Sequence, residues 1–391
     1  MASKKTTSGK RKDSKGRLLK QGESQRPDGT YCYRKMRNGK ADKPIYAKTL
    51  DELREKVRSR EKSLLYGIDL VQADKTVADF IEYVLNRPSN KRPQTLANYN
   101  SLYNSLKDYP LLSLRICEVR YVDCDNFVRE LATKYAKGSV RLRVALVKQA
   151  FNEAQKQDAI YQNYMKLIRL SDTEYRFQEG KNPEALERGE QQLFLDFARD
   201  VVHSSYYWDF VCLIETGLRI SELYGLTFPD IDWQTRTLKV ERQLYRLDGT
   251  YHVGPPKTQC GKRRIPLSDK AIDAFRHVIQ ERQKVKVEVM IDGVSGFLFL
   301  NRTGYPKTAN QAGDSIRLIR ERYREMYGED MPYITPHVLR HTFDSNMYHN
   351  GLDVKSLQAV MGHSTPQLTL DRYTDVDFDH IQKAFRLCSK A

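Results

Sequence analysis

The most informative stretch of the sequence reads Thr335-Pro336-His337-Val338-Leu339-Arg340-His341-Thr342-Phe343. Threonine is favoured just before a helix and proline at its first position, so Thr335 and Pro336 predict a helix that begins here. His337 and Arg340 are three residues apart and share a face of the first turn, where free N–H groups and the helix dipole favour an anion. The quoted stretch holds no carboxylate, so the pattern favours a phosphate site over a metal site, and His341 is interpreted as a packing or supporting residue.

A second pattern lies upstream, in the segment Glu215-Thr216-Gly217-Leu218-Arg219-Ile220-Ser221-Glu222-Leu223. An apolar helix is expected to end at Gly217, because glycine is the usual residue after a helix. Arg219 then lies in the turn before the next short helix, with Glu222 near enough to orient it. An arginine held in this way can clamp an oxyanion. Taken alone, it can equally be a helix-capping or surface arginine.

Two further patterns place reactive side chains at element boundaries. Lys257 lies in the loop between strands expected at Thr237–Val240 and Arg263–Leu267, where a hairpin tip can carry a lysine into a DNA groove. Downstream, Gly362 ends a helix capped by Asp353, and His363 lies in that turn. Thr365-Pro366 begins a further helix that carries Tyr373. Taken alone, this lysine is one of many, and a tyrosine near a C-terminus is usually a surface or core residue.

The patterns are informative jointly, because their polar residues follow one another in a single order, which reads Arg219, Lys257, His337, Arg340, His363, Tyr373. With this spaced set, from about Glu215 to Thr374, the chain resembles the tyrosine recombinases of the phage integrase family. It is most similar to the integrases of conjugative transposons. A further likeness to their arm domain lies in the basic segment from Gly16 to Arg26.

The resemblance implies a role for each residue. Arg219 and Arg340 would hold the non-bridging oxygens of the scissile phosphate, and Lys257 would protonate the leaving 5′ oxygen. His337 would take part in proton transfer, and His363 would donate a hydrogen bond to the phosphate. Tyr373 would attack phosphorus and form a 3′-phosphotyrosyl link. Two positions depart from the family pattern without touching a catalytic residue: Val338, where a polar residue is common, and Gly261, where serine is common.

Composition and charge agree with a DNA-binding enzyme. The chain has 391 residues, enough for two or three domains, and a formal net charge of +16. Residues 1–60 hold 19 Lys/Arg against 7 Asp/Glu, so most of the excess is N-terminal. Such a basic module favours a polyanion, and nucleic acid over membrane, although a solvated basic tail is the alternative. The six cysteines are scattered without a CxxC pair, which indicates free thiols, with Cys212 in the core. We expect no transmembrane helix and no secretory signal.

The basic module has signs of structure. Residues 31–36 are expected to form a strand, with turn dipeptides Asp28-Gly29 before it and Asn38-Gly39 after it, and 45–47 a returning strand. Thr49, with Glu52 three residues later, predicts a helix from Leu50 to about Tyr66. A two-stranded ribbon of this size fits the major groove of DNA. Residues 67–75 are expected to be a linker. About four helices follow, the last of them capped by Ser139.

The sequence therefore predicts a multidomain α+β protein with a small basic β-sheet arm-binding domain, a helical core-binding domain, and a mainly α-helical catalytic domain with a small antiparallel sheet. The expected boundaries are a basic disordered tail over 1–15, the arm-type domain over 16–70, the SAM-like helical core-binding domain over 76–172, and the catalytic domain over 184–391. Residues 171–187 are expected to be a second linker.

The predicted function is site-specific recombination of DNA that integrates, and also excises, a mobile element. No acidic cluster is placed for Mg²⁺ and no Walker motif is present, so no metal and no cofactor are expected. The resemblance implies core-type and arm-type double-stranded DNA sites, a homotetramer on DNA, an excisionase, a host DNA-bending protein and a cytoplasmic, bacterial location. Asp377–Leu387 could pack on a neighbouring subunit or on its own domain. The alternatives are a type IB topoisomerase-like enzyme and a non-catalytic DNA-binding regulator.

Overall fold

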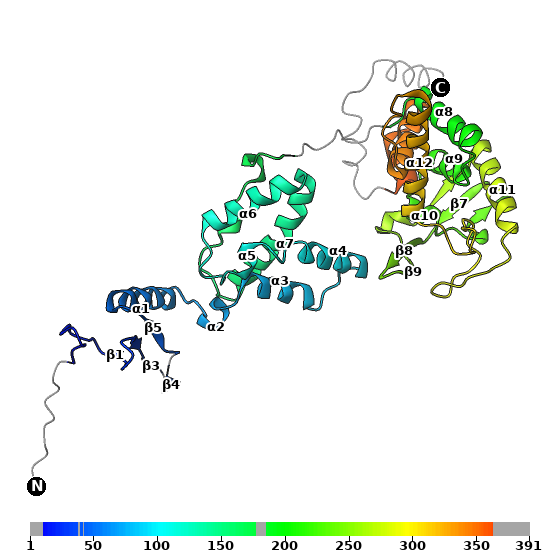
Figure 1. Ribbon diagram of the computed structural model, residues 1–391. Coiled ribbons are helices and arrows are strands. Elements are labelled where there is room, and N and C mark those ends of the chain that lie inside the picture. Colours follow the sequence, from blue (N-terminus) through cyan, green and yellow to red (C-terminus); the bar gives the residue numbers. More distant parts are fainter. Residues whose placement is uncertain (1–10, 38–39, 42, 177–184, 363–391) are drawn as a thin grey trace, which may run out of the picture. The chain divides into compact units, whose positions relative to one another are not determined.

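The computed structural model describes residues 11–37, 40–41, 43–176 and 185–362 (Figure 1). The chain divides into two compact units, Met1–Glu179 and Gly180–Ala391. The first unit contains a small sheet with one helix and then a group of helices, and the second combines helices with short strands. The multidomain α+β class predicted from the sequence is therefore confirmed.

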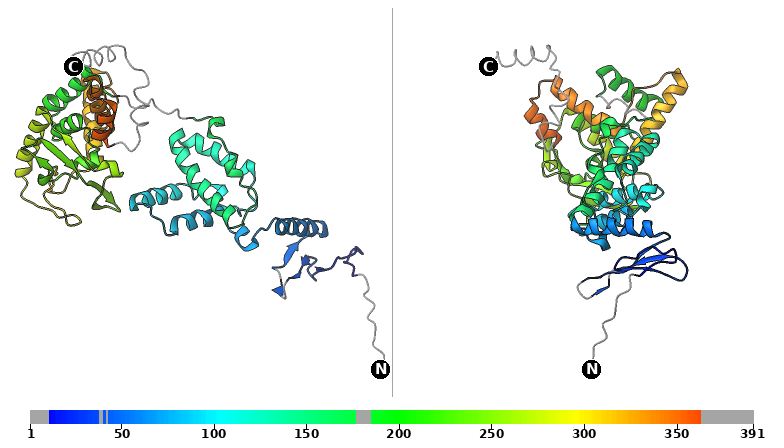
Figure 2. Two further views of the ribbon diagram at one scale, coloured as in Figure 1. Left: turned by 180° about the vertical axis from the view of Figure 1, so that it is seen from behind. Right: turned by 90° about the vertical axis from the view of Figure 1, so that its left-hand side faces the viewer.

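The first unit begins with a three-stranded antiparallel sheet in the order β1-β2-β5, formed by β1 (Glu23–Gln25), β2 (Tyr31–Tyr33) and β5 (Ile45–Ala47). A separate short pair joins β3 (Met36–Arg37) to β4 (Lys40–Ala41). Helix α1 (Leu50–Leu65) packs along one face of the sheet, as Figure 2 shows. The contact is apolar, since Leu50 and Leu53 lie against Tyr31 and Ala47.

The returning strand and helix α1 are confirmed, but the strand expected over residues 31–36 is wrong in extent. It breaks after Tyr33, which pairs with Ile45. The next residue of β2 would face Pro44, and proline has no N–H to continue the ladder. Strand β1 was missed because its residues, Glu23-Ser24-Gln25, have low strand propensity.

Helices form most of the rest of the described part of the first unit. They are α2 (Leu70–Ala73), α3 (Val77–Asn86), α4 (Pro93–Asn104), α5 (Pro110–Ser113), α6 (Tyr121–Lys134) and α7 (Lys137–Lys156), followed by the 3₁₀ turns η1 (Tyr164–Lys166) and η2 (Leu170–Asp172). Helix α3 packs across α7, and their buried faces form one apolar core with α5 and α6.

Two details of this helical part differ from the prediction. The expected linker over 67–75 contains the short helix α2, which Asp69 caps through the N–H groups of Val71 and Gln72. Ser139 does not cap α7, because the helix begins two residues earlier. The N–H of Val140 already donates to the carbonyl of Ala136, so Ser139 lies inside the first turn.

The second unit opens with helix α8 (Arg188–Asp196), its π-helical continuation η3 (Phe197–Val201), α9 (Tyr207–Thr216) and α10 (Ile220–Leu223). Then come the turn η4 (Phe228–Asp230), strands β6 (Ile231–Asp232), β7 (Thr237–Val240), β8 (Gln243–Leu247) and β9 (Thr250–Gly254), the turn η5 (Gln259–Gly261) and strand β10 (Arg263–Pro266). Helices α11 (Asp269–Gln283), α12 (Ala309–Tyr327), α13 (Pro336–His349) and α14 (Val354–Met361) complete it.

Helix α9 is central in this unit, because it packs against both α11 and α13. The strands form an antiparallel sheet in the order β10-β7-β6, and β8 pairs with β9 as a separate hairpin. The predicted helix start at Thr335 is confirmed, since its side chain accepts the N–H of Val338 and Pro336 occupies the first turn. The ends of α9 at Gly217 and of α14 at Gly362 are confirmed as well.

Candidate active site

Gly217 fixes the path of the chain into the candidate site. Its φ of 62° lies in the left-handed region, which favours glycine. A Cβ atom here would lie 2.3 Å from Cδ1 of Phe343, so α9 and α13 approach without room for a side chain. This tight exit brings Arg219 to the start of α10, where it occupies the capping position.

Arg219 and Glu222 bind each other at two points. The backbone N–H of Arg219 donates to one carboxylate oxygen of Glu222 at 3.0 Å, and its guanidinium donates to the other at 2.7 Å. The Glu222 side chain is 1% exposed, whereas that of Arg219 is 22% exposed. Glu222 therefore orients Arg219, as the sequence predicted. Part of the guanidinium remains open to solvent.

Arg340, on α13, lies beside the pair of Arg219 and Glu222. It is 1% exposed overall, and its guanidinium donates to the carbonyls of Gly217 at 2.5 Å and of Met361 at 2.6 Å. One of its nitrogens lies 3.9 Å from the carboxylate of Glu222. Burial and the positive charge of Arg219 lower the pKa of Arg340 to about 9, which still leaves the group charged at pH 7.

Arg263 is a third arginine on the same carboxylate, and it belongs to none of the sequence patterns that predict the site. It donates to Glu222 at 3.0 Å from strand β10, and its side chain is 5% exposed. A signal was present: strands alternate, so a buried Ile265 places Arg263 on the inward face and Arg264 on the outward one. Burial alone would raise the pKa of Glu222, but Arg263, Arg219 and Arg340 together lower it.

The cluster, defined as Glu222 with Arg219, Arg263 and Arg340, has two positive charges in excess. Guanidinium groups suit phosphate because their planar N–H donors can hold two oxygens at once. Preorganised positive charge such as that of Arg219 and Arg340 can stabilise the negative charge of a phosphoryl-transfer transition state, while Arg263 offsets the charge of Glu222. The open part of Arg219 is the side from which an anion can reach the cluster.

His337 and His341 lie one turn apart on α13, and their rings are 4.5 Å apart in an edge-to-face arrangement. His337 is exposed, and His341 is buried. The imidazole of His337 is thus accessible to a ligand at the first turn of the helix, and His341 packs behind it. Because Arg340 follows His337 by three residues, α13 links the exposed imidazole to the arginine cluster.

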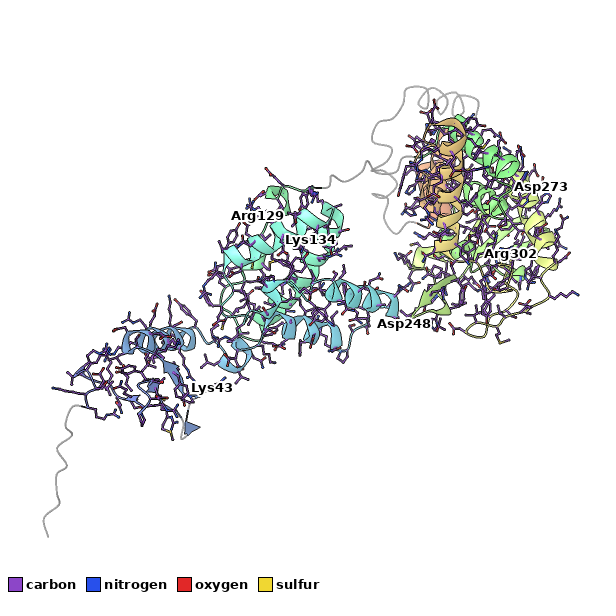
Figure 3. The ribbon with its side chains drawn as sticks, in the orientation of Figure 1. Lys43, Arg129, Lys134, Asp248, Asp273 and Arg302 are labelled. Carbon is purple, nitrogen blue, oxygen red and sulfur yellow. The ribbon has the colours of Figure 1, made fainter. Side chains whose placement is uncertain are left out.

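Lys257 is exposed, but its place in the fold differs from the prediction. An extra hairpin, β8–β9, stands between the two expected strands, and its tip is Asp248-Gly249, where Asp248 is labelled in Figure 3. Lys257 lies beyond this hairpin, in the connection from β9 to β10. In the same loop, a Cβ atom on Gly261 would lie 2.4 Å from Cβ of Pro256, so the loop leaves no room for a side chain there.

The remaining predicted site residues, His363 and Tyr373, lie outside the described residues, as does the segment Asp377–Leu387. The described chain ends at Gly362, directly before His363. Of the predicted residues that are described, Arg219 and Arg340 meet at Glu222, and Lys257 and His337 are both exposed.

The described cysteines, Cys32, Cys117, Cys124, Cys212 and Cys260, are free thiols, and Cys212 is fully buried. The expectations of free thiols and of a core position for Cys212 are therefore confirmed for these residues. Within the described ranges, none of the helices combines the length and the apolar character needed to cross a membrane.

Two protein-family models match this chain. The model of the phage integrase family matches residues 185–380, and the model described as the DNA binding domain of tn916 integrase matches residues 7–75. The chain is 32% identical to the transposase from transposon Tn1545 of Streptococcus agalactiae and 31% identical to that from transposon Tn916 of Enterococcus faecalis, each over 97% of both chains. The solved Tn1549 transposon integrase, in complex with a circular intermediate DNA, is 32% identical with a TM-score of 0.72, covering 80% of this chain and 99% of that one.

Proposed function

The chain belongs to the phage integrase family, and on that premise we propose that it integrates and excises a mobile element through a covalent 3′-phosphotyrosyl link to DNA. It is a tyrosine site-specific recombinase of the conjugative-transposon type, and its partner is DNA. The observation that carries the proposal is the arginine cluster on Glu222, whose excess positive charge suits an anion and is open to solvent at Arg219. Lys257 and His337, which the reaction needs, lie at exposed positions of the same unit.

In the proposed reaction, the phenolic oxygen of Tyr373 attacks the scissile phosphorus. The bond from phosphorus to the 5′ oxygen breaks as the bond to tyrosine forms. Arg219 and Arg340 hold the two non-bridging oxygens, and His363 donates a further hydrogen bond to them. His337 takes part in the transfer of the tyrosine proton, and Lys257 supplies a proton to the departing 5′ oxygen. A free tyrosine has a pKa near 10, so the positive site also assists its ionisation at neutral pH.

The same chemistry runs backwards without an energy source. The phosphotyrosyl link retains a phosphodiester-like bond, so a 5′-hydroxyl from another strand can attack it and release Tyr373. Joining therefore needs no ATP. Because each of two duplexes needs two cleavages, four active sites are required, which favours a homotetramer on DNA.

We assign the other regions by the same reasoning. Residues 16–70 bind arm-type sites, 76–172 bind the core site beside the cleavage point, and 184–391 hold the catalytic residues. The positive charge of the first 60 residues and the match to the DNA binding domain of tn916 integrase support the first assignment. An excisionase and a host DNA-bending protein are proposed as further partners, and the bacterial cytoplasm as the location.

The test is a trapping experiment with nicked DNA that carries the candidate attachment site and that the protein binds. Cleavage next to the nick releases a short fragment, so the covalent complex cannot rejoin. We expect an adduct that survives detergent, in the presence of EDTA, for the unaltered protein and for the control Tyr333→Phe. Tyr373→Phe should give none.

The outcome separates the alternatives. No adduct with the unaltered protein on bound DNA would favour the regulator and overturn the proposal. An adduct together with relaxation of supercoiled DNA, but without joining of two sites, would favour the topoisomerase-like enzyme. An adduct that disappears with EDTA would overturn the metal-independent step.

A further inference from the structure

Arg263 joins three segments of the second unit through its single guanidinium group. One nitrogen donates to the carboxylate of Glu222 at 3.0 Å, and another donates to the carbonyl of Gly261 at 3.0 Å. The third, Nε, donates to the carbonyl of Val360 at 2.5 Å. These acceptors belong to α10, to the loop that carries Lys257, and to the last turn of α14.

The contact with α14 is at the point where that helix ends. The last carbonyls of a helix have no intrahelical partner, and cations are favoured there. Arg263 donates a hydrogen bond to the carbonyl of Val360, and Arg340 donates one to the carbonyl of the next residue, Met361. The two arginines thus fix the end of α14 directly before Gly362, from which the chain continues to His363.

Gly362 keeps this end of α14 close to the lysine loop. Its φ of 65° is in the left-handed region. A Cβ atom on it would lie 2.8 Å from the carbonyl oxygen of Cys260 and 3.2 Å from Cδ of Arg263. The lysine loop, residues 255–262, therefore packs directly on the end of α14, with Arg263 between that helix end and Glu222.

We propose that Arg263 is a positioning residue that holds the lysine loop in register with the arginine cluster, so that Lys257 can protonate the leaving 5′ oxygen. The inference rests on the proposed function, because it assumes that role for Lys257. The Arg263 side chain is 5% exposed, with its guanidinium bonded to Glu222, Val360 and Gly261, and it acts through the loop. Its loss is therefore expected to slow cleavage while DNA affinity is retained.

A substrate with sulfur in place of the 5′ bridging oxygen distinguishes positioning of the lysine from general damage. A thiol has a pKa near 8.5, far below that of an alcohol, so it leaves as a thiolate without needing a proton. When Tyr373 attacks such a substrate, the phosphorus–sulfur bond breaks and the electron pair stays on sulfur. A defect that lies only in proton donation disappears on this substrate.

The experiment measures single-turnover cleavage of both substrates by the full chain. General acid catalysis typically contributes about 10²–10⁴-fold, so Lys257→Ala and Arg263→Gln should each cleave the oxygen substrate at least about 100-fold more slowly. On the sulfur substrate, both should return to within about 3-fold of the unaltered protein. Arg264→Gln, on the outward face of the same strand, is the matched control and should cleave both substrates normally.

Two results would overturn the inference. One is an Arg263→Gln protein that stays slow on the sulfur substrate while Lys257→Ala recovers. If Lys257→Ala does not recover either, the role of that lysine in the proposed function fails instead, so the two failures are distinguishable. If Arg263→Gln does not fold, Arg263→Lys tests the inference in its place. Lysine keeps the positive charge opposite Glu222, but its single ammonium group cannot reach all three acceptors. Normal cleavage of the oxygen substrate by Arg263→Lys is the second overturning result.

Discussion

Replacing Glu222 with glutamine removes the one negative charge that Arg219, Arg263 and Arg340 share. Glutamine has nearly the same shape, so the change tests charge rather than packing. An amide oxygen in the place of Oε2 can still accept from the backbone N–H of Arg219 and from Arg263, but the NH₂ group in the place of Oε1 now faces the guanidinium donor of Arg219. We expect the second unit to lose stability while its fold is retained.

The size of the loss follows from burial. The carboxylate of Glu222 is 1% exposed and the Arg263 side chain 5% exposed, so solvent screens their attraction only weakly. Removing one partner of a buried ion pair costs about 3–5 kcal/mol. We expect about 3 kcal/mol, because Arg219 is 22% exposed and can turn toward water. For a unit of about 200 residues, this corresponds to a fall in the melting temperature of about 6–12 °C.

The chain offers a convenient readout for this unit. It has two tryptophans, Trp208 and Trp233, and both lie in the second unit, so their fluorescence follows its unfolding in the intact protein. The matched control is Glu325→Gln. Glu325 pairs with Arg322 at an exposed position on α12, where a lost ion pair changes stability by less than about 1 kcal/mol.

The pH dependence provides a second check, and its sign is determined by the lowered pKa of Glu222. A lowered pKa in the folded state contributes stability above the unfolded pKa of about 4.3, and this contribution is lost as the pH falls through the folded value. The difference in the free energy of unfolding between the unaltered protein and Glu222→Gln should therefore be largest at pH 7 and become smaller below about pH 4. A gap under 1 kcal/mol at pH 7, or one that widens in acid, would refute the reasoning.

Three further predictions concern other parts of the chain. Gly217→Ala should destabilise the second unit by about 2–4 kcal/mol, measured by tryptophan fluorescence during thermal unfolding. Alanine is strained in the left-handed backbone that glycine adopts here, and its methyl group would collide with Phe343. Asp209→Asn should cost about 3–5 kcal/mol, since it leaves the amine of Lys307, 2.8 Å away and buried, without its counter-charge; a loss below 1 kcal/mol would contradict this. Arm-site binding should weaken about 100-fold between 50 and 200 mM salt if about four phosphates are contacted, and anisotropy titrations that show little change would exclude the basic-module interpretation.

Local patterns predicted the element boundaries near the site well, because a cap involves residues only a few positions apart. Thr335 and Pro336 begin α13, Gly217 ends α9 and Gly362 ends α14, each as its residue type indicates. The pair of Arg219 and Glu222 was also visible, since three residues separate its members.

The errors occurred where a partner distant in the sequence decides the structure. Strand β2 ends at Tyr33 because Pro44 lies opposite the next residue, and no local pattern shows that β2 pairs with β5 in this register. The sequence predicts Lys257 at a hairpin tip, whereas the structure adds the hairpin β8–β9 before it. The strands of this hairpin alternate weakly in polarity, so local patterns do not predict them.

The sequence by itself determined the order of the polar residues along the chain, the basic character of the first 60 residues and the family to which the chain belongs. Only the tertiary structure decided that three arginines meet on one carboxylate. Arg340 contacts Gly217 across 123 positions of sequence, and Arg263 contacts Val360 across 97. The physical reason is burial: helix-end carbonyls and a carboxylate removed from water need donors, and the fold brings arginines from distant segments to supply them.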